Sequence, residues 1–311
     1  MSCQGALIAL GEGCCRLLLS MTIPKNIFTY WHQGWDAVPP VLRVCLNSIR
    51  RHHGGWKISL LDARTILDYL DPIPIPDGKW RLLPLAHRSD LIRTQLLLQH
   101  GGVWADPTVW FAGPMDEWLS KRLDSGLFMF HRPGRDRLIS NWLIAAEAGN
   151  PLVARFYEEL CRYWRENDFE TIGFTQRGAV NFLARVLHRN LRLPQIWFAE
   201  PMIRLFRHAP YMVYHYLFAK MVRTDPACAA VWSATPRLSA DAPHRLLRHG
   251  LLAPVTPEVE QTLQLADPPM FKLTWKLAGR RIPENSLLAE LFRREGLELP
   301  FEERPRVAES S

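Results

Sequence analysis

The side chains best suited to chemistry lie in one stretch, Ser89–Thr108, which reads S-D-L-I-R-T-Q-L-L-L-Q-H-G-G-V-W-A-D-P-T. Asp90 and Arg93 are three positions apart, so on a helix they share a face, and Asp106 follows a short apolar segment. An acid at a strand end, backed by an acid–base pair, suits a bound diphosphate and its divalent cation, because hard cations prefer carboxylate and phosphate oxygens together. The alternative is structural: Asp90 and Arg93 form a surface ion pair, and Asp106 is a turn residue before a proline.

Three elements must position these side chains. Arg88–His100 is predicted to be a helix with an apolar leucine face and Ser89 as its N-cap. Gly101-Gly102 ends that helix, because glycine tolerates the positive φ that a helix C-cap often needs. Val103–Ala105 is then a short buried strand that delivers Asp106 to its carboxyl end, where ligands collect in open α/β sheets. At such a strand end, Asp106 is expected to contribute little to packing.

The rest of the chain predicts an α/β protein. Asn26–Trp31 and Trp56–Leu61 are expected strands, and a helix is expected to begin at Pro39-Pro40. The strand–helix–strand order favours an open, mainly parallel sheet. The further expected elements are the strands Gly126–Phe130 and Gln195–Ala199 and the helices Ser140–Ala148, Pro151–Glu166 and Ser286–Arg294. We expect residues 1–21 to be a disordered leader, residues 22–250 one catalytic domain, and residues 251–311 a helical C-terminal extension with a polar tail.

Several motifs occur in the order found in a known family. They are I-P-K-N-I-F-T-Y-W at Ile23–Trp31, S-D-L-I-R at Ser89–Arg93, G-G-V-W-A-D at Gly101–Asp106, I-S-N-W at Ile139–Trp142, Y-H-Y-L-F at Tyr214–Phe218 and K-L-T-W-K at Lys272–Lys276. Over roughly residues 23–276 the chain resembles the capsular polysaccharide synthesis proteins, which are related to the family 32 glycosyltransferases with a DXD-containing sugar-binding region. The resemblance implies a single catalytic domain of GT-A type with an open, mainly parallel, Rossmann-like sheet.

The resemblance also implies an activity: transfer of a hexosyl group from a nucleotide sugar, with UDP-sugar favoured, to a glycan or lipid-linked acceptor. The expected setting is capsule or surface polysaccharide synthesis, with retention of the anomeric configuration and the leaving phosphate as base. The implied catalytic residues are Asp106, Asp90 and Arg93. The implied donor-binding residues are Thr29, Tyr30, Trp31, Ser89, Asp90, Arg93, Gly102, Trp104 and Thr108.

The implied cofactor is a divalent cation, Mn²⁺ or Mg²⁺, bound by Asp106 with His215 as a further candidate ligand. A hydrogen-bonded core histidine is the alternative for His215. The family pattern is Asp-x-Asp, whereas this chain has Asp106-Pro107-Thr108, so a hydroxyl replaces the second carboxylate. Metal dependence is therefore in question, and a catalytically inactive relative that only binds a nucleotide sugar is a second hypothesis. Lys272 and Lys276 would clamp a diphosphate if they lay one turn apart on a helix, or otherwise belong to a solvated face.

Charge and cysteine usage bear on partners and location. The net charge is +7, and Pro201–Gly250 holds seven basic residues and two acids. Such a field attracts phosphates, nucleic acid or an anionic membrane, but no nucleic-acid-binding signature accompanies it, so a basic nucleic-acid-binding protein is the weaker alternative and we expect no nucleic acid partner. The six cysteines lack a CxxC motif and are typical of reduced cytosolic thiols. We therefore expect a cytoplasmic protein with peripheral membrane contact at the inner face, made through the basic residues and exposed Tyr211, Met212 and Phe218.

Overall fold

The computed structural model describes residues 23–174, 178–277 and 280–300, and the expected leader lies outside them. Among the described residues, the central sheet has five strands in the order β2-β1-β3-β6-β5. Its members are β1 (Asn26–Tyr30), β2 (Lys57–Leu61), β3 (Gly102–Ala105), β5 (Leu127–Gly134) and β6 (Arg137–Ala146). β1 pairs in parallel with β2 and β3, and β6 runs antiparallel to both of its neighbours. The expected α/β class with an open, mainly parallel sheet is confirmed.

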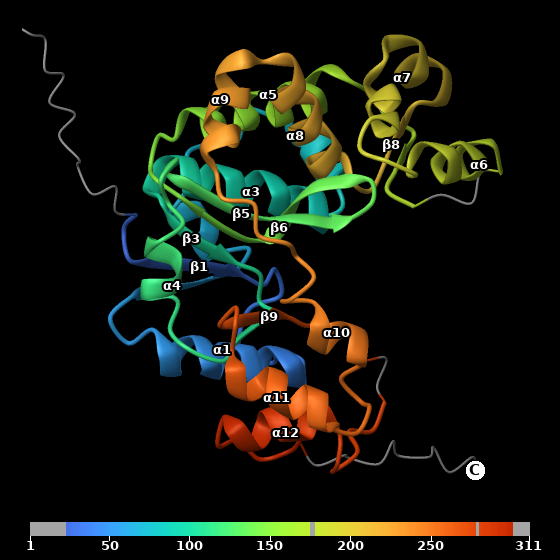
Figure 1. The fold of residues 1–311 in the computed structure, drawn as a ribbon. Coiled ribbons are helices and arrows are strands. Elements are labelled where there is room, and N and C mark those ends of the chain that lie inside the picture. Colours follow the sequence, from blue (N-terminus) through green and yellow to red (C-terminus); the bar gives the residue numbers. More distant parts are fainter. Residues whose placement is uncertain (1–22, 175–177, 278–279, 301–311) are drawn as a thin grey trace, which may run out of the picture.

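Helices cover both faces of this sheet (Figure 1). One face packs against α3 (Leu85–His100), α5 (Pro151–Glu166) and α8 (Val213–Thr224). The other lies against α1 (Pro40–His52) and the two-stranded ribbon of β4 (Val109–Phe111) and β9 (Met270–Lys272). The remaining elements are α2 (Asp77–Leu82), α4 (Asp116–Ser120), β7 (Thr171–Ile172), α6 (Gly178–Leu187), α7 (Glu200–Phe206), β8 (His208–Ala209), α9 (Pro226–Ala234), α10 (Arg245–His249), α11 (Pro257–Leu265), α12 (Leu287–Arg294) and the 3-10 helices Thr65–Asp68 and Leu193–Phe198.

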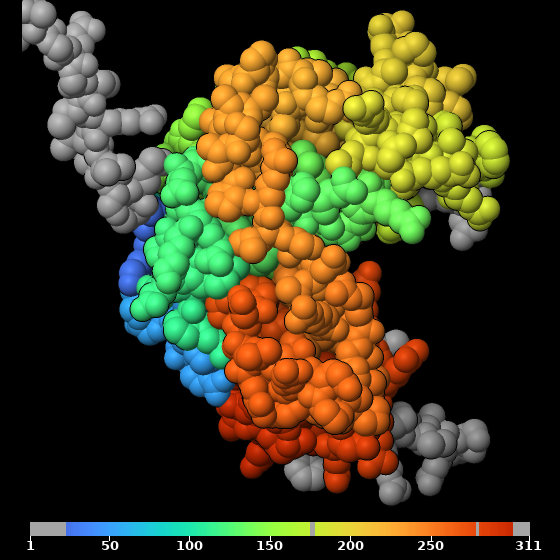
Figure 2. Space-filling model, in the orientation of Figure 1, coloured from blue at the N-terminus to red at the C-terminus, as the bar shows by residue number. Residues whose placement is uncertain are grey.

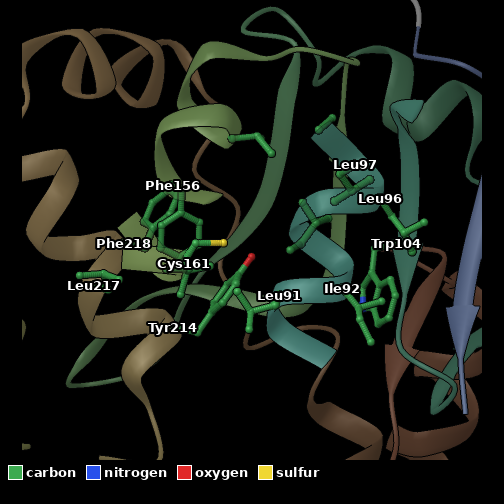
Figure 3. Packing of buried hydrophobic residues seen from close by; sticks show 14 of the residues in the cluster. Leu91, Ile92, Leu96, Leu97, Trp104, Phe156, Cys161, Tyr214, Leu217 and Phe218 are labelled. Carbon is green, nitrogen blue, oxygen red and sulfur yellow. The ribbon is translucent and has the colours of Figure 1, made fainter. Parts of the chain in front are cut away.

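Buried apolar side chains on both faces of the sheet attach it to the surrounding helices. In β1, Phe28 faces the helices α3, α5 and α8, whereas its neighbour Ile27 faces α1, as the period of two in a strand requires. Figure 3 shows Trp104 of β3 beside Ile92 of α3, and Tyr214 of α8 beside Leu91. These side chains are almost completely buried. The helix that carries Asp90 and Arg93 is therefore fixed to the strand that leads to Asp106.

The Gly101-Gly102 turn ends α3 as expected, and it also allows the sheet to form. Gly102 has a φ of +103°, and a Cβ there would lie 2.6 Å from the carbonyl oxygen of Asn26. β1 and β3 pair directly beyond this point. A side chain at Gly102 would force the two strands apart, so this glycine positions the site through the backbone.

Three local expectations were wrong. Residues 140–148 are not a helix, because most of them belong to β6, which lies between β3 and β5. A central strand with both faces buried loses the polar–apolar alternation that identifies a strand. Gln195–Ala199 is not a strand, since Leu193–Phe198 forms a 3-10 helix. Ser89 does not cap α3, because the helix begins at Leu85, directly after Pro84.

The C-terminal part of the chain returns to the sheet. β9 pairs antiparallel with β4, with Lys272 opposite Val109, so Lys272 lies on a strand and the condition of a helical spacing with Lys276 is not met. α12 is capped by Ser286, whose Oγ accepts from the N–H of Ala289 at 3.3 Å, and it packs near α1 (Figure 1). The division into domains at residue 250 stays a prediction.

His53 at the end of α1 gives stability a pH dependence. It is buried, its Nε2 accepts from the backbone N–H of Met115 at 3.3 Å, and its Nδ1 donates to the carbonyl of Ile49 at 3.1 Å, so the ring is neutral. Burial lowers the pKa of His53 from 6.5 to about 4. As the pH falls from 6.5 towards 4, the unfolded state binds the proton first. We expect a loss of roughly 1–2 kcal/mol in the free energy of unfolding between pH 7 and pH 5 from this residue.

Urea denaturation at the two pH values checks this prediction. His53→Gln should lose less stability on acidification than the wild type, whereas His249→Gln, at a partly exposed histidine of α10, should behave as the wild type. An equal loss in the wild type and His53→Gln would contradict it.

Candidate active site

A cavity of about 530 Å³ opens beyond the carboxyl ends of β1 and β3. Its wall combines the end of β1, α3, the β5–β6 hairpin, the start of α8, α10 and β9, and Figure 2 shows the surface hollowed between the hairpin and the α10 region. The polar and aromatic lining residues include Tyr30, Trp31, His32, Ser89, Asp90, Arg93, Asp106, Arg137, Ser140, Asn141, Trp142, Tyr211, His215, His244, Lys272, Trp275 and Lys276. This is the sheet edge at which the sequence predicts a ligand site.

Arg93 is the most connected side chain of the cavity. Its guanidinium donates to Asp106 Oδ1 at 3.2 Å, to the carbonyl oxygen of Asn141, and to the Oγ and carbonyl oxygen of Ser89 at 3.1 Å each. It also lies 4.9 Å from the centre of the Trp104 ring. Arg93 is only 5% exposed. The alternative of a surface ion pair is therefore wrong, and Arg93 ties α3, β3 and β6 together beneath the cavity.

Asp106 is held by three donors. Oδ1 accepts from Arg93 and, at 2.9 Å, from the indole N–H of Trp104, while Oδ2 accepts from Lys272 Nζ at 2.6 Å. Burial alone would raise the pKa of Asp106, but Lys272 and then Arg93 lower it, and the net shift is downward. The carboxylate is therefore ionised at neutral pH. The expectation that Asp106 contributes little to packing is wrong, since it is the anion shared by two cations.

Asp90 lies one helical turn before Arg93 in the same wall. Its Oδ1 accepts from the side-chain amide of Asn141 at 3.0 Å and lies 3.5 Å from Arg93 Nε. Its Oδ2 is 3.7 Å from His87 Nδ1, a distance too long for a hydrogen bond. One carboxylate oxygen is thus engaged, and the other is available to a ligand.

Three buried polar atoms of the cavity wall have no hydrogen-bond partner within the described parts of the chain. They are His215 Nδ1, Ser140 Oγ and Trp142 Nε1. Burial lowers the pKa of His215 to about 4, so its ring is neutral at pH 7. Buried polar groups in folded proteins are nearly always paired. Each of these atoms is itself buried, so a ligand in the cavity would reach it only after a rearrangement of the wall.

Two tryptophans, Trp31 and Trp275, line another part of the cavity wall. The rings of Trp31 and Trp275 meet edge to face with centroids 5.6 Å apart, and Trp275 is 45% exposed. Next to them, the hydroxyl of Tyr30 and His32 Nδ1 form a hydrogen bond of 2.8 Å. An exposed indole at the mouth of a polar cavity offers a stacking surface for a flat ring.

The structure brings most of the predicted site residues together. Tyr30, Trp31, Ser89, Asp90, Arg93, Asp106 and His215 line the cavity. Thr29, Gly102 and Trp104 are buried in β1 and β3 away from the lining, and Thr108 touches the site through Lys272. These four therefore have supporting positions rather than direct contact with the cavity.

Sequence reasoning missed other lining residues, above all Asn141, Ser140, His244 and Trp275. Ser140, Asn141 and Trp275 lie within motifs that carry the family resemblance, which was the available signal. For the metal, the described ranges contain no group of three or more His, Cys, Asp or Glu side chains placed to bind an ion.

The sequence also matches a known protein family. The family model for capsular polysaccharide synthesis proteins matches residues 19–184, more than half of the chain. The chain belongs to this family.

Two curated relatives match part of the chain. The O-glycosyltransferase braB of Annulohypoxylon truncatum is 29% identical over 168 residues, which cover 46% of this chain and 38% of the relative. The O-glycosyltransferase PaGT of Phomopsis amygdali is 24% identical over 159 residues, covering 45% and 39%. This chain thus spans well under two thirds of the length of either relative. A solved structure titled PaToxG Glycosyltransferase is 12% identical with a TM-score of 0.37, covering 79% of this chain and 86% of its own.

Proposed function

We propose that this protein is a glycosyltransferase of GT-A type that transfers a sugar from a nucleotide-sugar donor to a glycan or lipid-linked acceptor. The observation that carries the proposal is the buried Arg93–Asp106–Lys272 cluster at the carboxyl edge of the sheet, inside a cavity large enough for a donor. The O-glycosyltransferase relatives support the same reaction class. Surface polysaccharide synthesis is the setting that the family description favours.

The donor is proposed to lie along the cavity wall. Its base stacks on Trp275 beside Trp31, and its diphosphate meets Lys272. Its sugar meets the free oxygen of Asp90. The cavity lining has four cationic side chains, Arg93, Arg137, Lys272 and Lys276, and two carboxylates, a net charge of +2 that suits an anionic donor. A UDP-sugar is the favoured donor.

The proposed reaction is hexosyl transfer with retention. The bond between the anomeric carbon and the phosphate oxygen breaks, and its electron pair goes to that oxygen. The acceptor oxygen bonds to the anomeric carbon on the same face, and its proton goes to the departing phosphate. Both oxygens of Asp106 are engaged, and the free oxygen of Asp90 is assigned to the donor sugar, which favours a mechanism that uses the leaving phosphate as its base. NMR checks this assignment: the anomeric proton of the product should show the same anomeric configuration as that of the donor sugar.

A divalent cation is the cofactor implied by the resemblance. Such a cation needs several oxygen ligands, whereas Asp106 is the one carboxylate of the Asp106-Pro107-Thr108 motif and both of its oxygens are engaged. The residues around Asp106 therefore do not fit Mn²⁺ or Mg²⁺, and we derive no step through a metal.

Thermal denaturation with UDP-, GDP-, CMP- and dTDP-sugars tests donor binding. A ligand at 100 times its Kd stabilises the native state by about 2.7 kcal/mol, which raises the melting temperature by roughly 4 °C in a chain of this size. We expect one nucleotide class to produce such a shift. Trp275→Ala should reduce the affinity for that nucleotide by roughly 5- to 100-fold, the range of one lost base–aromatic contact, whereas Trp80→Ala, in α2 and outside the cavity, should not. No shift with any nucleotide would contradict the proposal.

The two alternatives have less support. A catalytically inactive nucleotide-sugar-binding relative is favoured by Thr108 alone, and donor hydrolysis separates it from an enzyme. For nucleic-acid binding, the basic residues of Pro201–Gly250 are distributed over α7, α8, α10 and the segments that follow α7 and α9, with α7 and α10 well apart in Figure 1. Several are paired with acids, such as Arg204 with Glu200 and Arg248 with Asp241. They do not form one basic face.

Peripheral membrane contact is the last element of the proposal. Within the described chain, no helix has the length and apolar character needed to cross a bilayer. Phe218 is fully buried, so it cannot contribute to membrane contact as expected, but Phe182 of α6 and Leu205 of α7 are 69% and 75% exposed in one lobe (Figure 1). We propose that this lobe touches an anionic surface through these side chains and the exposed Arg185 and Arg189 beside them, since each nearby Lys or Arg adds about 1 kcal/mol.

Co-sedimentation with vesicles checks that contact. Pelleting should require anionic lipid and weaken as salt rises, because salt screens the attraction. The double variant Phe182→Ser, Leu205→Ser should pellet less than the wild type, whereas Leu67→Ser, at another exposed apolar residue, should pellet equally. Equal pelleting with neutral and anionic vesicles, or none with either, would argue for an acceptor in solution.

A further inference from the structure

The contacts of Lys272 differ from those of a solvated surface lysine. Its ammonium donates to Asp106 Oδ2 at 2.6 Å and to Thr108 Oγ1 at 2.7 Å, so it bridges the first and third positions of the Asp106-Pro107-Thr108 motif. In an Asp-x-Asp motif both of these positions carry carboxylates. Here the third position carries a hydroxyl, which accepts a hydrogen bond from the Lys272 ammonium. A cationic side chain therefore already contacts the oxygens that a metal would need.

The fold fixes Lys272 in this place. β9 pairs antiparallel with β4, and the N–H of Leu273 donates to the carbonyl of Thr108 at 2.8 Å. On the other side, the N–H of Lys272 donates to the carbonyl of Pro243 at 2.9 Å. The neighbouring Phe271 is fully buried. The backbone on both sides of Lys272 is therefore held, and its side chain is directed across the motif by the sheet register.

The ammonium keeps capacity for a ligand. Lysine has three N–H donors, and Asp106 and Thr108 accept two of them. The side chain of Lys272 is 18% exposed, and it lines the cavity. One N–H is thus available to an oxygen of a ligand in the cavity.

We propose that the Lys272 ammonium is the fixed cation that binds the donor diphosphate and stabilises its departure, in the place where an Asp-x-Asp site would hold a divalent cation. This inference rests on the proposed function. When the bond between the anomeric carbon and the phosphate oxygen breaks, the nucleoside diphosphate gains one negative charge. Lys272 donates a hydrogen bond to the terminal phosphate and stays protonated throughout, because the acceptor's proton goes to the departing phosphate. Fixed donors aimed at developing charge stabilise a transition state without reorganisation.

Calorimetric titration of the full chain with UDP and with inorganic pyrophosphate, in EDTA and then in excess Mn²⁺, tests the proposal. UDP is the favoured nucleotide, and the nucleotide class found by thermal denaturation replaces it if different. The wild type should bind equally well under both conditions. Lys272→Met should bind at least about tenfold more weakly in EDTA, the loss of one charge-assisted contact. Lys121→Met, at an exposed lysine outside the cavity, should bind as the wild type.

The outcomes separate the two proposals. Binding by the wild type only when Mn²⁺ is present would overturn the role of Lys272 and leave the glycosyltransferase proposal intact. No binding of any nucleoside diphosphate in either condition would overturn both. The wild-type comparison needs no variant, so it can overturn the proposal even if Lys272→Met fails to fold.

A double variant gives a second readout. Thr108→Asp combined with Lys272→Ala recreates an Asp-x-Asp pair and removes the ammonium. It should bind the nucleoside diphosphate in Mn²⁺ but at least about tenfold more weakly in EDTA, a metal dependence that the wild type lacks. Metal-independent binding by a folded double variant would show that the ammonium is dispensable and would overturn the proposal.

Discussion

Replacement of Arg93 by alanine is expected to lower the free energy of unfolding by about 3–5 kcal/mol, the cost of removing one partner from a buried ion pair. Arg93 is 5% exposed and shares Asp106 with Lys272, and it also binds Ser89 and the carbonyl of Asn141. Its removal leaves Asp90 and Asp106 without their common cation and opens the contact between α3, β3 and β6. The loss of donor binding should accompany the loss of stability.

Urea denaturation of Arg93→Ala measures the effect. Arg155→Ala is the matched control, because Arg155 forms an exposed pair with Glu158 on α5 at 3.0 Å, and such pairs contribute about 0–1 kcal/mol. Arg93→Lys keeps the charge but not the planar, multiply hydrogen-bonded group, and should fall between the wild type and Arg93→Ala. Equal stability of Arg93→Ala and Arg155→Ala would contradict the buried network.

Asp106→Asn is expected to reduce the rate of donor turnover by roughly 100-fold or more, the scale of a lost electrostatic group in an active site. Asparagine keeps the shape of aspartate but not the charge that holds Lys272 at 2.6 Å and Arg93 at 3.2 Å. The variant should also lose about 1–3 kcal/mol of stability, because two partly buried cations lose their anion. Steady-state kinetics and denaturation of the same preparation measure the two effects. Turnover near the wild-type value would contradict the assignment.

The part of the site that is local in sequence could be predicted from it. Asp90, Arg93 and Asp106 lie on one helix–glycine–strand unit, and the carboxyl end of a strand is a general ligand position. The same reasoning predicts that Asp106 contributes little to packing, whereas its carboxylate accepts from both Arg93 and Lys272. Its partner Lys272 comes from β9, which pairs with β4 far away in the chain, and no local pattern predicts a pairing of that range.

The errors in the fold have the same origin. The sequence predicts a helix over residues 140–148, and the run I-S-N-W-L-I-A-A has no clear alternation that would identify the strand β6. The strand lies between β3 and β5 with both faces covered, so apolar residues occupy both sides. That burial depends on tertiary neighbours, and it also places Asn141 beside Asp90. Amphipathic elements such as α1 and α5, with one buried face, were predictable from their own residues.

This cavity is proposed to activate a nucleotide sugar, and release of the nucleoside diphosphate measures that activation most directly. The wild type and Asp106→Asn would be incubated with UDP-, GDP-, CMP- and dTDP-sugars, with water as the acceptor, in EDTA and in Mn²⁺. We predict slow release of the nucleotide from at least one donor by the wild type, already in EDTA, and roughly 100-fold less by Asp106→Asn. Absence of release from every donor by folded wild-type protein in both conditions, or equal release by the two proteins, would contradict the account.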